Sequence, residues 1–325
     1  MKLLPLLWVL LFVIPFPTRS MAHPWSDPLT SLGILVSDTQ PKKQFIPLSE
    51  KRVEHPWSKS NEPIIQRVGF SYLYNETHEQ SSWVAYELTK KEVQSSLAIR
   101  SNKFLSDPLV FTGTATAADY AESGYDRGHL APAADMRWSP IAMSESFYFS
   151  NISPQIPAFN RGIWKQLEDL VRNWAMENES VFIVTGPVLT PDLHKLPNSR
   201  VSIPELFFKV VLDTNSSHLN GIGFLLANKN NDSSLTSYVV TIDSVQKITG
   251  LDFFYLLPDS VEKQIESLVC IPCWSWNGIS SKTNSSKQKP LNSTLVQCGG
   301  ITKSGKRCSR TTFCPNGRCF QHGCK

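Results

Sequence analysis

Charged residues are scarce in this chain of 325 residues, at 18%, whereas 41% of the residues are hydrophobic. Disordered proteins show the opposite bias, so the composition excludes a disordered chain. Glycine is also infrequent, with 16 residues, and no run of heptads is visible, which excludes collagen-like and coiled-coil rods. After the N-terminal residues, no stretch is long and apolar enough to span a bilayer. The chain is long enough to form one large hydrophobic core with appendages.

Acidic residues are absent from residue 267 to the C-terminus, although the whole chain contains 28. This segment carries a charge of +9, so the remainder must carry −5 to give the net charge of +4. The sequence therefore predicts a mildly acidic body with a basic tail. Such a tail either contacts a polyanion or an anionic surface, or is simply solvated.

The N-terminus combines Lys2 with an apolar stretch that runs to Pro17. A basic residue, an apolar centre and the small residues Ser20 and Ala22 predict a secretory signal peptide over residues 1–22. An uncleaved membrane anchor is the alternative, although the stretch is short for a bilayer span. Seven Asn-x-Ser/Thr sequons and seven cysteines agree with a secreted glycoprotein that contains disulfides.

The middle of the chain, residues 61–268, shows short apolar runs that predict strands, with few helices between them. The clearest helix is expected over residues 163–176, where apolar side chains recur at helical spacing. Shorter helices are expected over 244–248 and 259–267. The order of elements predicts an α+β fold with an antiparallel sheet. The expected strands cover residues 70–74, 83–88, 147–152, 181–188, 207–212, 221–227 and 238–242.

Three other segments flank this body. Residues 23–60 are rich in proline and predict an extended N-terminal arm. Residues 269–297 are rich in Ser, Asn and Lys and lack periodicity, which is typical of a linker. Residues 298–325 form a basic, Cys-rich tail module.

The tail allows two interpretations. Cys298, Cys308, Cys319 and His322 supply a Cys₃His set that suits tetrahedral zinc, although a Cys-x₉-Cys spacing is unusual. The alternative is a module held together by disulfides. Because seven is an odd number, one cysteine must then stay a thiol or pair with another chain.

The segment that carries chemistry is Ser-Gly-Tyr-Asp-Arg-Gly-His-Leu at residues 123–130, which we expect to form a loop or turn. A structural role for His129 alone would be the simplest interpretation. However, Asn151 follows at the end of a predicted strand, and Asn160 and Glu168 follow at the start and in the first half of the predicted helix. Positions 160, 164 and 168 share one helical ridge, so an imidazole, a guanidinium, amides and a carboxylate can converge.

These residues resemble those of the DNA/RNA non-specific endonucleases of the ββα-metal type, and most of all the mitochondrial endonuclease G branch, from which the predicted secretory signal peptide departs. The resemblance spans roughly residues 62–258 and rests on several motifs in family order. They occupy residues 116–120, 123–129, 151–155, 160–168, 185–187 and 240–245. It implies a ββα-metal fold with a central antiparallel sheet, to which the Cys-rich tail is added.

The resemblance also implies a reaction, the hydrolysis of DNA and RNA to 5′-phosphate and 3′-hydroxyl ends. His129 would be the general base, since imidazole titrates near neutrality. Arg127 would clamp the phosphate, because a guanidinium matches it bidentately. We expect Arg100 to be a second phosphate contact.

A metal ion is the remaining requirement that the resemblance implies. Asn160 would bind one Mg²⁺, for which Mn²⁺ is an expected substitute, and Glu168 would hold metal-bound water. Asn151 would orient His129 or its strand. A glycan on Asn151 would cover this site, so its sequon is expected to be empty. The family also implies a homodimer.

A catalytically inactive protein with the nuclease fold, used for binding nucleic acid or a surface, is the competing hypothesis. Loss of a functional residue would favour it, and Arg127, His129, Asn160 and Glu168 are all present.

Overall fold

The computed structural model describes residues 55–60, 62–214, 219–277, 296–302, 304–309, 311–312, 318 and 322. The predicted signal peptide, residues 23–54 of the predicted arm and residues 278–295 of the predicted linker lie outside this part of the chain. Among the described residues, no helix combines the length and the apolar character that crossing a membrane requires.

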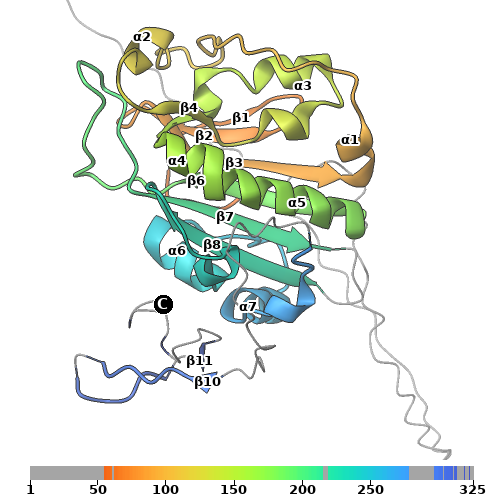
Figure 1. Ribbon diagram of the computed structural model, residues 1–325, viewed down its shortest axis with the longest axis vertical. Coiled ribbons are helices and arrows are strands. Elements are labelled where there is room, and N and C mark those ends of the chain that lie inside the picture. Colours follow the sequence, from red (N-terminus) through yellow and green to blue (C-terminus); the bar gives the residue numbers. More distant parts are fainter. Residues whose placement is uncertain are drawn as a thin grey trace, which may run out of the picture. The chain divides into compact units, whose positions relative to one another are not determined.

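The described body is built on an antiparallel sheet of seven strands, in the order β1-β2-β3-β6-β7-β8-β9 (Figure 1). Two further pairs, β4 with β5 and β10 with β11, form separate ribbons. The predicted α+β class with a central antiparallel sheet is confirmed. The strands are β1 (Ile64–Gln66), β2 (Ser71–Asn75), β3 (Gln80–Thr89), β4 (Asp126–His129), β5 (Ile152–Gln155), β6 (Ser180–Pro187), β7 (Leu206–Asp213), β8 (Asn220–Ala227), β9 (Val239–Val240), β10 (Val296–Gln297) and β11 (Thr311–Thr312).

Helices cover both faces of this sheet. The long helix α5 packs on one face, whereas α6 and α7 contribute to the core on the other. The α-helices are α1 (Lys90–Gln94), α2 (Ala117–Tyr120), α3 (Pro140–Glu145), α4 (Pro157–Phe159), α5 (Lys165–Glu177), α6 (Ile242–Thr249) and α7 (Asp259–Ser267). Shorter helical turns are η1 (Ala133–Met136), η2 (Phe149–Asn151), η3 (Asn160–Trp164), η4 (Leu235–Tyr238) and η5 (Ile271–Cys273).

The interior strand β7 shows why both faces of the sheet must be covered. Successive side chains of a strand point to opposite faces. Phe207 and Val211 belong to the core beneath α5, and Phe208 and Val210 belong to the core beneath α6 and α7. Burying one such side chain stabilises the fold by about 1.5–3 kcal/mol. Lys209 shares the α5 face with Phe207, and it is 1% exposed, which is exceptional for a lysine.

The helix predicted over residues 163–176 is present, but its start differs from the prediction. α5 begins at Lys165 and follows a π-helical turn, η3, in which Gly162 has non-helical dihedral angles. The regular ridge expected to join Asn160 to Glu168 is therefore interrupted. The reason is local, because glycine readily adopts conformations outside the helical region.

The chain continues to pack on the body beyond residue 268, within the segment expected to be a linker. Trp274 is 4% exposed, and its ring lies 4.4 Å from that of Trp174 on α5, centroid to centroid. The Nε1–H of Trp174 donates a hydrogen bond to the carbonyl of Ser275 at 2.5 Å. A disulfide joins Cys270 to Cys273 in the same segment. Trp274 and Trp276 of this segment thus extend the core.

The described end of the predicted N-terminal arm lies on the body in the same way. Trp57 and Asp252 exchange two backbone hydrogen bonds, and the His55 ring stacks on Trp83 at 5.6 Å.

Candidate active site

The segment that contains His129 is a strand rather than the expected loop. β4 pairs antiparallel with β5, so that Arg127 lies opposite Pro154 and His129 lies opposite Ile152. Because side chains alternate along a strand, Arg127 and His129 share one face of the ribbon. Glycine is required between them, since a Cβ at Gly128 would overlap the side chain of the buried Gln155.

Asn151 braces the chain just after His129. Its side chain accepts a hydrogen bond from the Ala131 N–H and donates to the carbonyls of Ala131 and Ser146, each at 2.9 Å. The residue is completely buried. A glycan on its Nδ2 does not fit the folded chain, because that nitrogen is buried and already donates to two carbonyls.

His129 lies in an aromatic cavity, where it is 8% exposed. Its ring meets Phe147 edge-on at 4.7 Å and lies 5.6 Å from the ring of Phe104. Burial lowers the pKa of His129 to about 3, and the nearby charges of Arg100 and Arg127 act in the same direction. The imidazole is therefore neutral near pH 7 and can accept a proton. Its Nε2 has no hydrogen-bond partner among the described residues.

The same two aromatic rings position the two arginines. The guanidinium of Arg127 lies 4.2 Å above the centroid of the Phe104 ring, and that of Arg100 lies 5.1 Å from the centroid of the Phe147 ring. Cation–π contacts of this kind hold a guanidinium while its N–H donors stay available. The structure thus brings Arg100 to His129, although 29 residues separate them in the chain.

Asn160 is held by an acidic residue of β4. Its Nδ2 donates to Asp126 Oδ2 at 2.8 Å, and Arg161 pairs with both oxygens of the same carboxylate. Burial alone would raise the pKa of Asp126, but the hydrogen bonds from Arg161 and Asn160 keep it below its usual range. Since a carboxylate accepts only from the amide N–H₂, this contact leaves the carbonyl oxygen of Asn160 available to bind another group.

Glu168 lies in a cluster of charged groups beneath the first turns of α5. Burial raises the pKa of its carboxyl, while the positive charges of Lys209 and Arg172 oppose this shift. Arg172 also donates to the buried Asp135 at 2.6 Å. Lys209 Nζ lies 4.8 Å from the centroid of the Trp164 ring and has no hydrogen-bond partner among the described residues.

The partners of the predicted site residues were not among the residues that the sequence indicated. Arg172 follows Glu168 by four residues on the same helix, so its spacing was a usable signal. Asp126 and Arg161 are next to Arg127 and Asn160 in the sequence, and only the pairing of Asp126 with Arg161 could not be predicted. Lys209 carried no signal, because a lysine within an apolar strand is usually exposed.

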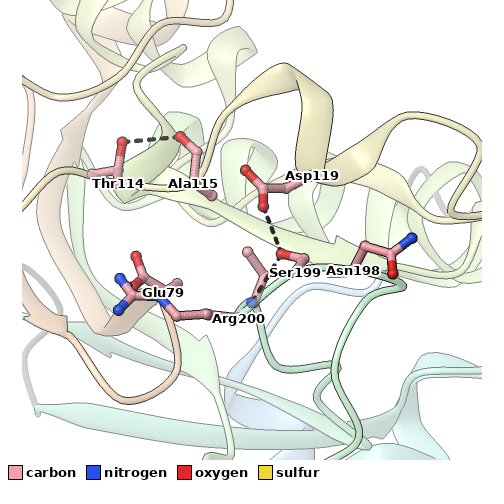
Figure 2. Close-up of a pocket in the computed structure, with 8 residues that line it drawn as sticks. Glu79, Thr114, Ala115, Asp119, Asn198, Ser199 and Arg200 are labelled. Carbon is pink, nitrogen blue, oxygen red and sulfur yellow. Dashed lines mark hydrogen bonds and ion pairs between the residues drawn. The ribbon is translucent and has the colours of Figure 1, made fainter.

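Two hollows accompany this site. A pocket of about 470 Å³, in which Asp119 bonds Ser199 and Arg200 pairs with Glu79, is lined by none of the predicted site residues (Figure 2). A second hollow of about 320 Å³ is lined by Arg100, together with Arg137 and neighbouring apolar residues. The smaller hollow is the one that adjoins the predicted site, because Arg100 lines this hollow and is also one of the predicted site residues.

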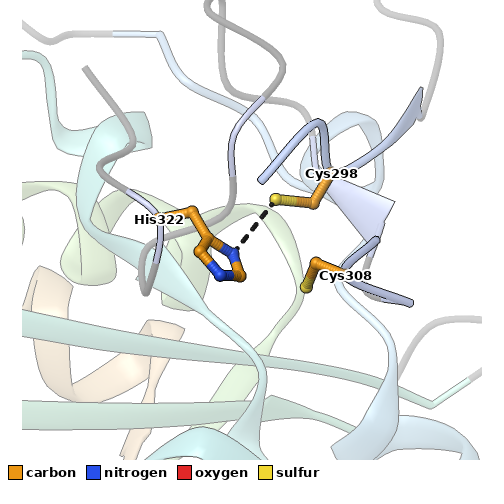
Figure 3. A group of neighbouring side chains, drawn as sticks. All are labelled: Cys298, Cys308 and His322. Carbon is orange, nitrogen blue, oxygen red and sulfur yellow. Dashed lines mark hydrogen bonds between the residues drawn. The ribbon is translucent and has the colours of Figure 1, made fainter. Parts of the chain in front are cut away.

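In the tail, the structure brings Cys298, Cys308 and His322 together (Figure 3). Cys319, which the sequence assigns to the same set, lies outside the described residues. A disulfide between the tail and Cys270 or Cys273 is excluded, because these two cysteines pair with each other.

Comparison with known proteins agrees with the geometry. A family model described as DNA/RNA non-specific endonuclease matches residues 51–260. The mitochondrial nuclease of Saccharomyces cerevisiae is 32% identical over 224 residues, which cover 61% of this chain and 68% of that protein. The nuclease of Serratia marcescens is also 32% identical, over 65% of this chain and 82% of its own.

Human mitochondrial endonuclease G is 31% identical over 201 residues, which cover 58% of this chain and 68% of its own. Among solved structures, a crystal structure of the EndoG/EndoGI complex contains a similar chain, with a TM-score of 0.57 and 27% identity. The match covers 61% of this chain and 88% of the other.

The prediction of a secreted protein is wrong on this comparison. The nucleases of yeast, human and cow among these relatives are named as mitochondrial. The prediction rested on one basic residue followed by an apolar stretch in residues 1–22, which lie outside the described residues.

Proposed function

This chain belongs to the DNA/RNA non-specific endonuclease family, and from that premise we propose that it is a Mg²⁺-dependent endonuclease of DNA and RNA. The products would carry 5′-phosphate and 3′-hydroxyl ends. The observation that carries the proposal is the buried His129, whose Nε2 lies beside two arginines and has no hydrogen-bond partner in the part of the chain that the structure describes.

His129 would act as the general base. The attacking water gives a proton to Nε2 while its oxygen bonds to phosphorus. The bond from phosphorus to the 3′-oxygen breaks, and that oxygen takes up a proton from solvent to give the 3′-hydroxyl end. A base must be unprotonated to do this, and the lowered pKa of His129 keeps the ring neutral near pH 7.

Arg127 and Arg100 would bind the phosphate. A phosphodiester is an anion, and two guanidinium groups beside the base attract it and stabilise the additional charge of the transition state. Their aromatic supports restrict the side chains before substrate arrives, which lowers the entropy cost of binding.

The residues present fit Mg²⁺. The carbonyl oxygen of Asn160 would hold it, and Glu168 would orient the water around it, because Mg²⁺ prefers oxygen ligands and retains several waters. When bound, the ion would stabilise negative charge on the phosphate and the leaving oxygen. Asp126 fixes the Asn160 amide, and Asn151 fixes the backbone after His129.

Three further features belong to the same proposal. Mn²⁺ would replace Mg²⁺, since it also favours oxygen ligands. The basic tail would contact the polyanionic substrate or an anionic surface. A homodimer follows only from the family resemblance, and light scattering of the purified protein would test it.

The test is cleavage of plasmid DNA and of RNA by the full chain, with Mg²⁺ and with EDTA. We expect Mg²⁺-dependent cutting that His129→Ala lowers by roughly 10²–10⁴-fold. His194→Ala, which removes an exposed histidine, is the matched control and should keep full activity. Folded protein that binds nucleic acid without cutting it would instead support the inactive binding protein.

A further inference from the structure

The C-terminal part of the chain gathers soft metal ligands that are not among the proposed catalytic residues. The Sγ atoms of Cys298 and Cys308 and a ring nitrogen of His322 lie within 4.8 Å of one another. Figure 3 shows the three side chains grouped together, with a contact drawn from Cys298 to the imidazole. Thiolate and imidazole are the ligands that structural zinc sites use.

The separation of the ligand atoms suits a metal between them. Cys298 Sγ lies 3.5 Å from His322 Nδ1. With Zn–S at about 2.3 Å and Zn–N at about 2.0–2.1 Å, tetrahedral coordination places sulfur and nitrogen about 3.6 Å apart. The observed distance therefore fits two ligands of one ion without movement of the chain.

A tight turn explains how Cys298 and Cys308 meet although ten residues separate them. The N–H of Cys308 donates to the carbonyl of Gly300, and Ile301 pairs with Arg307 in an antiparallel bridge. The chain reverses at Gly305, whose φ of 77° lies in the left-handed region that glycine tolerates best.

Gly300 prepares this site in two ways. Its N–H donates to Cys298 Sγ at 3.3 Å, a contact that stabilises a thiolate and orients its lone pairs. It also lacks a side chain where the His322 ring packs, because a Cβ there would overlap the imidazole. The imidazole and the first cysteine can approach each other only because residue 300 is glycine.

The described tail has no hydrophobic core that could hold this arrangement. Its buried apolar cluster consists of the two cysteines themselves, which are 0% and 2% exposed. Small modules without a core need a metal or a cross-link to be stable.

We propose that Cys298, Cys308 and His322 bind one Zn²⁺, which folds the C-terminal module independently of the nuclease reaction. The fourth position of the tetrahedron would be taken by another side chain or by water. The set of two sulfurs and one nitrogen favours zinc over Mg²⁺, which binds oxygen. The exposed Lys306 and Arg307 would thereby be held on one rigid turn.

Elemental analysis of the full-length protein, after dialysis against metal-free buffer, tests the proposal. We expect about one Zn²⁺ per chain, and an intense visible spectrum of tetrahedral thiolate coordination when Co²⁺ replaces it. Cys298→Ser and His322→Ala should each lower the zinc content at least about tenfold. Their kcat in Mg²⁺ should be unchanged, because the tail is not part of the proposed catalytic site, and this separates the proposal from the proposed function.

Two controls remove the same residue types elsewhere. His194→Ala and the double variant Cys270→Ser/Cys273→Ser should retain zinc. The proposal is overturned if the wild-type chain, purified with zinc present, holds none. It is also overturned if both site variants keep their zinc, or if peptide mapping finds a disulfide between Cys298 and Cys308.

Discussion

Lys209 is the residue whose charge most directly opposes protonation of Glu168. Its ammonium is buried beneath α5, and it lowers the pKa that burial of the Glu168 carboxyl has raised. Lys209→Met keeps the volume and removes the charge, so the pKa of Glu168 must rise further. The proposed mechanism needs the ionised carboxylate, and we therefore expect the acidic limb of the activity profile to move to higher pH.

The measurement is kcat/KM against pH in Mg²⁺, with thermal unfolding to verify the fold. Lys165→Met is the matched control. Lys165 is an exposed lysine on α5, the helix that carries Glu168, and solvent screens its charge. An acidic limb that stays in place in Lys209→Met, in a folded enzyme, would contradict the electrostatic role.

Arg100 is expected to contact the phosphate although it lies outside the motif that contains His129. A hydrogen bond to a charged group contributes about 1.5–3 kcal/mol, so Arg100→Gln should lower kcat/KM roughly 10- to 150-fold. Lys103→Gln removes the same charge from an exposed position three residues away and should change it less than about threefold. Equal losses in both variants would show that only the general positive charge matters.

At the scale of elements, the β4–β5 ribbon sets the direction of the side chains of the proposed catalytic residues Arg127 and His129. Gly128 packs directly against the side chain of Gln155, which is completely buried. Gly128→Ala should destabilise the fold by about 1–3 kcal/mol, the usual cost of overpacking. Calorimetry should therefore show a lower Tm by several degrees, at roughly 2–4 °C per kcal/mol.

A second substitution separates steric overlap from other effects of the alanine. Gln155→Ala removes the atoms that the new Cβ would meet, so the double variant should recover most of the Tm lost in Gly128→Ala, measured against Gln155→Ala alone. Additive losses in the double variant would show that the backbone conformation, rather than the contact, requires glycine.

At the scale of the whole molecule, charge is divided between an acidic body and a tail of +9. If the tail contacts the substrate, each lysine that neutralises a phosphate adds about 0.9 to the salt dependence of binding. Lys287→Gln/Lys306→Gln should therefore weaken DNA binding at low salt and reduce the slope of log Kd against log salt by up to about 2. The same change at the exposed residues of the body, Lys247→Gln/Lys263→Gln, should leave the slope unchanged.

Short-range patterns in the sequence determined the family, most of the strands and the main helix. Alternation along 207–212 and the helical stripe over 163–176 depend only on neighbouring residues, so they are visible without a structure. The motif around His129 likewise identifies the residue types that phosphodiester hydrolysis needs. The predicted signal peptide showed the limit of such patterns. A basic residue before an apolar run led to the wrong prediction of a secreted protein.

Only the tertiary structure decided which distant residues meet. Pairing of β4 with β5 turned an expected loop into a rigid ribbon, and packing of β7 under α5 placed Lys209 among the charges around Glu168. The low pKa of His129 is also a property of the tertiary structure. It is caused by burial and by the nearby charge of Arg100, which comes from a distant part of the sequence. Local preference acts over one or two turns, whereas burial and long-range electrostatics depend on the complete fold.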